Sequence, residues 1–326
     1  MTEKKDVGFI GALCKSKERL LIGEEKFARM IDTDTAEDAF RMLRESGFGG
    51  DAEASGARDF EKLIAAETES FNRFLREYAP GENYAEALLL ANDFHNADCL
   101  VRIAHGYGGE GMLKEDGYYS VAEIRKATEG SRAELPEELL TAIRSANKLF
   151  DDGEAGGAKL TTLFLNAYYA RMAAICPDKL VKKAIAAEID AKNIAVAMRS
   201  ADAKTAKEMR LAGGTLTDGD FATLTGGDLR RIRSAFLYSP LRELVDAALD
   251  EKEKNAPLIG FERLAEGAFL KTLKQRRYET EGAVPYLLYA YYKRNELINV
   301  RVVMAGKLCG AEKERIRGRL REGYDG

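Results

Sequence analysis

Three copies of one short pattern constrain the fold of this chain more than any other feature. In each copy an acidic residue is followed three positions later by asparagine, inside a segment rich in apolar residues. The copies are Asp93-x-x-Asn96, Asp190-x-x-Asn193 and Glu296-x-x-Asn299. Apolar residues stand four positions before each acid and four, seven and eight positions after it. These offsets share one face of an α-helix, so each acid–amide pair is predicted to lie within an apolar helix face.

A carboxylate or amide in that position is costly unless it has hydrogen-bond partners. We therefore expect a polar network between helices, with Arg102, Arg199 and Arg301 as candidate cations for the acids. Replacing Asn193 by Leu would then leave its acid unpaired, at a cost of about 1–3 kcal/mol. The functional alternative is three catalytic carboxylates. It is disfavoured because successive asparagines are 97 and 106 positions apart, which indicates three domains rather than one cleft.

The rest of the chain also favours helices. Helices are predicted at 18–21, 25–31 and 36–44, with Thr33 or Thr35 capping the third, at 59–78 and 84–104, and at 159–174 in the middle of the chain. No convincing strand is found. The Gly-rich stretches 106–117 and 211–219 are interpreted as boundaries between units. The prediction is an all-α protein with three similar helical domains at 1–110, 111–212 and 213–326, each about a hundred residues long.

Composition excludes several classes of function. The net charge of −4, with acids and bases interspersed, gives no reason to expect a nucleic-acid partner. No segment reaches the roughly 18 apolar residues of a membrane-spanning helix, and the N-terminal segment is a weak match to a signal peptide. The four cysteines are widely scattered, which favours free cytosolic thiols packed as small hydrophobic side chains. These features indicate a soluble cytosolic protein.

Motifs for enzyme chemistry are weak. Gly106–Gly111 matches G-x-G-x-x-G by letter, but it follows a helix, whereas a dinucleotide site needs a strand before this loop. There is no phosphate-binding P-loop, and the two histidines, His95 and His105, lack a neighbouring ligand set for a metal. The sharpest enzyme hypothesis is an all-helical, magnesium-dependent prenyl diphosphate enzyme, because Asn92-Asp93 matches part of a metal motif. No D-D-x-x-D run accompanies it, so we expect no catalytic residue, no metal and no cofactor.

Several ordered motifs resemble one known family. Asn92-Asp93-Phe94-His95-Asn96, with Arg102 after an apolar run, is similar to the first-repeat signature of the C subunit of archaeal and bacterial V-type (A/V-type) ATPases, the counterpart of the eukaryotic d subunit. The closing stretch is similar too, from Pro285-Tyr286-Leu287-Leu288 through Glu296–Arg301 and Met304–Lys307 to Ile316–Tyr324. The middle unit, with Tyr168-Tyr169 and Asp190–Asn193, fits less strictly. The resemblance covers essentially the whole chain.

The resemblance implies a pseudo-threefold funnel of three helical domains that acts as a rotor part of the central stalk. Such a protein sits on the membrane proteolipid ring, receives the foot of the axle formed by the D and F subunits, and passes torque between them. ATP synthesis or hydrolysis and the coupled transport of ions such as hydrogen ions would then occur elsewhere in the complex. The implied location is peripheral, on the cytoplasmic face of the membrane, with membrane contact only through the ring.

Two other hypotheses stay open from the residues alone. One is a soluble helical scaffold or adaptor, although adaptor repeats usually have periods of about 20–50 residues. The other is the prenyl diphosphate enzyme, for which a magnesium-dependent activity would be the test.

Overall fold

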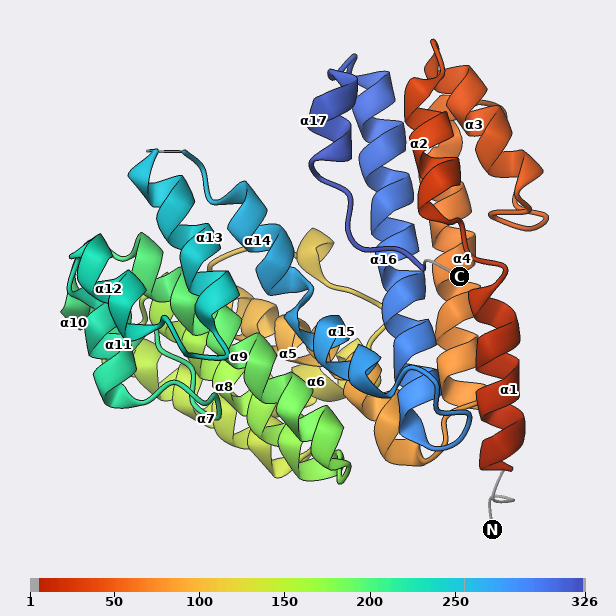
Figure 1. The fold of residues 1–326 in the computed structure, drawn as a ribbon. Helices are drawn as coiled ribbons and strands as arrows, with labels where there is room; N and C mark the ends of the chain where they lie inside the picture. Colours follow the sequence, from red (N-terminus) through yellow and green to blue (C-terminus); the bar gives the residue numbers. More distant parts are fainter. Residues whose placement is uncertain (1–5, 255, 325–326) are drawn as a thin grey trace. The chain divides into compact units, whose positions relative to one another are not determined.

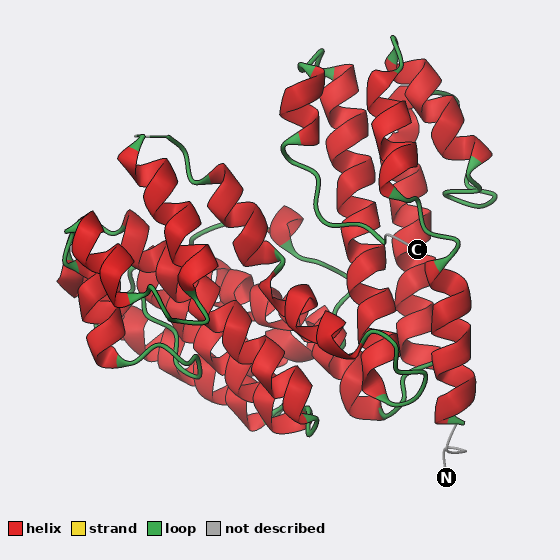
Figure 2. Cartoon of the chain, in the orientation of Figure 1, coloured by secondary structure: helices red, strands yellow, loops and turns green. Residues whose placement is uncertain are grey.

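The computed structural model describes residues 6–254 and 256–324, and every regular element in these ranges is a helix (Figure 2). No strand occurs in the part of the chain that is described, which confirms the all-α prediction. The chain separates into two compact units, one combining residues 1–82 with 273–326 and the other comprising residues 83–272. These units do not follow the predicted domains of residues 1–110, 111–212 and 213–326, and that division stays a prediction.

The first unit is organised around one long helix near the C-terminus. The helices of this unit are α1 (Val7–Glu18), α2 (Glu24–Asp32), α3 (Ala36–Glu45), α4 (Phe60–Glu77), α16 (Ala283–Leu308) and α17 (Lys313–Arg317), with short 3₁₀ turns η1 (Ala57–Asp59) and η3 (Lys274–Arg276). Helix α16 packs against α1, α2, α3 and α4, which lie together on one side of it in Figure 1. At its start Tyr286 is fully buried, and its hydroxyl donates to the carbonyl of Leu75 over 2.7 Å. Apolar burial along α16 therefore joins the two ends of the chain in one core.

The second unit is built on two further long helices, α5 (Glu82–Ala104) and α9 (Lys179–Arg199), each of which carries an acid–amide pair. Its other helices are η2 (Glu110–Met112), α6 (Val121–Thr128), α7 (Glu137–Asp151), α8 (Gly157–Ile175), α10 (Ala203–Glu208), α11 (Asp218–Thr225), α12 (Leu229–Ala235), α13 (Arg242–Glu253), α14 (Ile259–Glu266) and α15 (Ala268–Leu273). Helix α9 packs against α8, α11, α13 and α14. Ile194 of α9 lies in a buried cluster with Phe221, Ile232 and Phe261.

Most predicted helices are present, and the caps follow the sequence. Thr35 is the N-cap of α3, and its hydroxyl accepts from the amide of Asp38 over 3.1 Å. The helix predicted at residues 18–21 is wrong in position, because α1 covers Val7–Glu18 and ends where that helix was expected to begin. Gly11 lies at a close approach between α1 and another part of the chain. A Cβ there would lie 1.7 Å from the carbonyl oxygen of Thr280, so the absence of a side chain lets α1 pack closely on the chain before α16.

The four cysteines divide into two groups. Cys14, Cys99 and Cys176 are buried free thiols, as expected for small hydrophobic side chains. Cys309 is exposed, so the packing expectation is wrong for this residue. It lies immediately after α16, where the helix has left the core and the chain turns at Gly310.

Candidate functional site

The three asparagines make the same contact at three places in the fold. Each is at most 1% exposed, and each clamps the backbone of one residue downstream. The side-chain oxygen accepts from that residue's amide, and the side-chain nitrogen donates to its carbonyl. Asn96 binds Lys114 over 2.9 and 2.8 Å, Asn193 binds Leu211 over 2.8 and 2.9 Å, and Asn299 binds Arg321 over 2.8 and 2.9 Å. The amide group thus imitates a peptide unit and pairs with a loop that has no helix or strand partner there.

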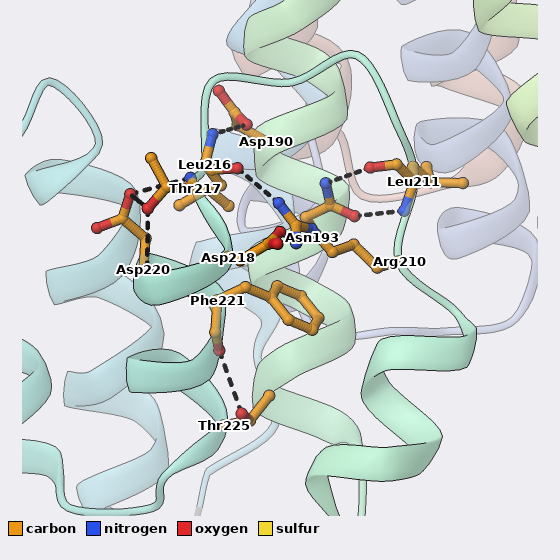
Figure 3. A network of polar contacts seen from close by, with 10 residues as sticks. All are labelled: Asp190, Asn193, Arg210, Leu211, Leu216, Thr217, Asp218, Asp220, Phe221 and Thr225. Carbon is orange, nitrogen blue, oxygen red and sulfur yellow. Dashed lines mark hydrogen bonds and ion pairs between the residues drawn. The ribbon is translucent and has the colours of Figure 1, made fainter.

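The first two acids bind the same loops a few residues further on. Asp93 accepts from the amides of Tyr118 and Tyr119 over 3.0 and 3.1 Å. Asp190 accepts from the Thr215 amide at 2.8 Å and from the Thr215 hydroxyl at 2.5 Å. It also accepts from the Leu216 amide at 3.0 Å (Figure 3). Both acids are at most 1% exposed. Backbone amides are strong hydrogen-bond donors to a buried carboxylate, which explains how these charges are tolerated.

A glycine precedes the two bound amides in both loops. An added Cβ would lie 2.1 Å from a carboxylate oxygen of Asp93 at Gly117, and 2.2 Å from one of Asp190 at Gly214. Each carboxylate therefore occupies the space that a side chain would need. Both glycines stand 24 positions after their acids. Each lies in one of the two Gly-rich stretches that the sequence analysis interprets as boundaries between units.

The third acid is satisfied in a different way. Glu296 accepts from the backbone amide of Ile22 over 2.7 Å, in the turn between α1 and α2. It also accepts from Lys293 over 2.5 Å, and Lys293 contacts Glu67 over 2.7 Å. Burial raises the pKa of the Glu296 carboxyl, while the adjacent Lys293 ammonium and the Ile22 amide oppose that rise. The N-terminal segment therefore supplies a backbone amide donor to Glu296, as the downstream loops do to Asp93 and Asp190.

The three arginines expected as cations for the acids have other partners. Arg102 pairs with Asp98 over 2.7 Å, Arg301 pairs with Glu61 over 2.7 Å, and Arg199 pairs with Glu262. The arginines do not reach the acids for a geometric reason. A position nine residues after the acid lies about 180° round the helix from it, and a position five residues after lies about 140° round. Asp93 and Asp190 bind backbone amides of loops, whereas Glu296 takes part in a polar network between helices, through Lys293 to Glu67 of α4.

The six side chains lie on three different helices. Asp93 and Asn96 lie on α5, Asp190 and Asn193 lie on α9, and Glu296 and Asn299 lie on α16 in the other unit. Each pair binds its own loop or turn. Within residues 6–254 and 256–324, no group of three His, Cys, Asp or Glu residues is arranged to hold a metal ion. The geometry of these pairs suits the fixing of loops onto helices.

Sequence reasoning missed the residues that complete the clamps. Lys114, Leu211 and Arg321 contribute only backbone atoms, so their side chains carry no signal for the contact. Lys293 could have been found because it stands three positions before Glu296 on the same helix. Glu67 could have been found because it lies on the buried face of α4. The contact of Ile22 with Glu296 spans 274 positions and has no local signal.

Comparison with known proteins gives one consistent picture. Residues 10–319 match the model of the family described as ATP synthase (C/AC39) subunit. The C subunit of the V-type sodium ATPase of Enterococcus hirae is 21% identical over 325 residues, which is 97% of this chain and 98% of that protein. The C subunit of the A-type ATP synthase of Halobacterium salinarum is 27% identical over 148 residues, covering 44% of this chain and 42% of that protein. No described helix is long and apolar enough to cross a membrane.

Proposed function

Because the chain belongs to the ATP synthase (C/AC39) subunit family, we propose that it joins the membrane proteolipid ring to the D and F axle subunits of a V-type ATPase or ATP synthase. In this role it is a central-stalk rotor part that passes torque between ring and axle. It performs no chemistry itself, and ATP is made or hydrolysed by other subunits. The observation that carries the proposal is the family match over residues 10–319. The Enterococcus relative, named as the C subunit of a V-type sodium ATPase and aligned over nearly the whole chain, supports it.

The buried clamps suit a part that must turn as one body. A loop fastened by two hydrogen bonds to a buried amide cannot shift without breaking both, and each costs free energy to leave unmade. Three loops are fastened in this way, by Asn96, Asn193 and Asn299. Two of these loops are also held by hydrogen bonds to Asp93 and Asp190. We propose that these polar contacts specify one arrangement of helices and loops more sharply than apolar packing alone.

We further propose three repeats with the bounds 1–110, 111–212 and 213–326, placed as a funnel about a pseudo-threefold axis. The recurrence of the asparagine clamp on α5, α9 and α16 supports this division. The protein would lie at the cytoplasmic face of the membrane and be held there by the proteolipid ring, which agrees with the match to a subunit of a membrane complex.

The test is a depletion and add-back experiment. Membranes that carry the ATPase but lack this chain are supplied with the purified chain, and ATP-driven ion uptake is recorded together with ATP hydrolysis. We expect uptake to be lost without the chain and restored by it, because the ring is then joined to the axle again. Full ion uptake in membranes proven to lack the chain would contradict the proposal.

A further inference from the structure

The loops that Asp93 and Asp190 hold both lead into a new helix. Asp93 accepts from the amide of Tyr119, which immediately precedes the N-cap of α6. Asp190 accepts from the amide of Leu216, which immediately precedes the N-cap of α11. Both N-caps stand 27 positions after their acids. Each loop is therefore clamped by an asparagine and held at its end by an acid. We call these two loops connectors: residues 105–119 and 200–216.

Helix α2 begins in the same way, although it lies near the start of the chain. Ile22 immediately precedes its N-cap, Gly23, and the amide of Ile22 donates to Glu296 over 2.7 Å. A buried apolar residue stands four positions after the N-cap in all three helices: Phe27, Ile124 and Phe221. With an apolar or aromatic residue just before the cap, this is the pattern of a hydrophobic staple. Glu296 therefore holds the start of α2 as the other two acids hold the starts of α6 and α11.

The opposite end of the chain supplies the rest of this third contact. In each connector an asparagine clamps the loop, whereas Asn299 clamps Arg321, close to the C-terminus. The two segments meet, because a Cβ on Gly323 would lie 3.7 Å from Cγ of Glu24. The last described residues accordingly lie beside the start of α2 (Figure 1). Two separate segments thus occupy the place that one connector occupies after α5 and after α9. We call their contact the seam: residues 22–24 and 321–324.

The two sides of the seam are also joined to each other. Helix α17, which leads to the C-terminal segment, packs against α2. Arg317 pairs with Asp32 at the end of α2, while Gly323 lies against Glu24 at its start. Contacts at both ends of α2 tie the two segments together, so we expect them to open together.

A cluster of three charged side chains fastens the N-terminal side of the seam. Lys293 of α16 contacts Glu296 on the same helix over 2.5 Å and Glu67 of α4 over 2.7 Å. Glu67 also accepts from the amide of Gly49 over 2.9 Å, so the turn after α3 is held as well. All three charged side chains line a cavity of about 340 Å³ between α1, α4 and α16. The side chains of Lys293 and Glu67 are 11% and 19% exposed, so solvent reaches the cluster and hydrates its charges when the contacts separate.

Two features make the seam easier to open than the connectors. Asp93 and Asp190 each accept from two successive backbone amides, whereas Glu296 accepts from one among the residues that the structure describes. A connector is also one continuous loop tied at both sides. The seam must bring two separate segments together, and one of them is the end of the chain, which frays more readily.

We propose that the two ends of the chain form a third, non-covalent connector, and that this seam opens as one unit while the two covalent connectors stay closed. The Lys293 cluster and the Asn299 clamp are its two fastenings. Opening releases the start of α2 and the C-terminal segment from α16 together. This device goes beyond the rotor role, since it concerns the chain alone.

The experiment measures hydrogen exchange, resolved to single amides, in the full-length chain. Ile22 and Arg321 report on the seam, while Leu216 and Leu211 make the same two contacts in a connector. We expect protection factors, which correct for the intrinsic exchange rate at each residue, to be about tenfold or more lower for the two seam amides.

Two perturbations test whether the seam acts as one unit. Lys293→Met removes the ammonium between the two carboxylates and should lower the protection of both seam amides by a further tenfold or so, about the effect of breaking a buried pair. Lys192→Met is the matched control, because Lys192 stands on α9 in an exposed pair with Glu188. It should leave the seam amides within about twofold of the wild type.

The second perturbation closes the seam covalently. Glu24→Cys with Gly323→Cys, in a chain that also carries Cys309→Ser, places two thiols where the segments meet. Oxidation to the disulfide should raise the protection of both Ile22 and Arg321 relative to the reduced form, and leave Leu211 unchanged.

The results decide the proposal in either direction. Lower protection at the seam in the wild type, with both seam amides responding together to each perturbation, supports it. Equal protection at the seam and the connectors would overturn it, as would a response at one end without the other. A fall at Leu211 as large as that at Arg321 in Lys293→Met would show a general loss of stability, and would also overturn it. If Lys293→Met does not fold, the reduced and oxidised cysteine pair decides the same question.

Discussion

The substitution Asn193→Leu tests the clamp where it is most buried. Leucine keeps a similar volume but removes the two hydrogen bonds, of 2.8 and 2.9 Å, that Asn193 makes with the backbone of Leu211. Both residues are almost fully buried, at 1% and 4% exposure, so water cannot replace the lost partner. Each stranded backbone group costs about 1–3 kcal/mol, and the two together about 2–6 kcal/mol. The backbone groups of Leu211 are therefore the ones that lose their hydrogen-bond partners, whereas the sequence alone predicts that the acid would lose its partner.

The measurement combines urea unfolding with hydrogen exchange of the segment around Leu211. We expect a lower unfolding free energy and faster exchange of the Leu211 amide in Asn193→Leu. Asn166→Leu is the matched control, because Asn166 accepts from the neighbouring Ala212 amide over 2.8 Å at an exposed position. That variant should lose less than about 1 kcal/mol, since water can hydrate the freed amide. Equal losses in the two variants, or none in Asn193→Leu, would refute the reasoning.

Three further predictions concern other contacts. Gly117→Ala should cost about 1–3 kcal/mol in urea unfolding, because its Cβ would lie 2.1 Å from the Asp93 carboxylate. Gly111→Ala is the control, with open space around it, and should stay within about 0.5 kcal/mol; similar losses in the two variants would contradict this reasoning. Burial raises the pKa of Glu18 above its ordinary 4.5, so the folded chain binds that proton more tightly than the unfolded chain, and the stabilisation is lost as pH rises through the folded pKa. The wild type should therefore lose stability relative to Glu18→Gln as the pH rises above about 4.5 in urea titrations, and a constant difference would count against this. Arg301→Gln should cost less than about 1 kcal/mol in thermal unfolding because its pair with Glu61 is half exposed, and a larger loss would show that the pair is more than a surface contact.

The helices were predictable because their signals are local. The apolar offsets around Asp93, Asp190 and Glu296 place each acid inside an apolar face, and these residues are buried on α5, α9 and α16. The cap at Thr35 follows from its hydroxyl and the acids after it. Such patterns depend on residues within one or two turns of each other, so a single sequence contains them.

The partners of the buried pairs were not predictable in the same way. A backbone amide belongs to every residue type except proline, so nothing in the letters marks Lys114 or Leu211 as the clamped position. The candidate arginines stand close to the acids along the chain but on other faces of their helices, so each pairs with a different carboxylate. The contact of Glu296 with Ile22 depends on how the two ends of the chain meet, which only the fold determines.

The acid–asparagine pairs make the two faces of α5 and α9 different. On α5 and α9 the face that carries the acid and the asparagine holds a loop in place, and the opposite face lines an open groove. A substitution on the inner face should therefore act on stability first, because it removes the contacts that hold a loop on the helix.

Co-sedimentation tests the central claim most directly. Membranes that carry the proteolipid ring are mixed with the D–F axle, with and without the purified chain, and the axle that sediments is measured. A chain that joins ring to axle should bring the axle down with the membranes only when it is present. If the axle sediments equally without the chain, or stays in solution while the chain binds the ring, the chain is not the link between them.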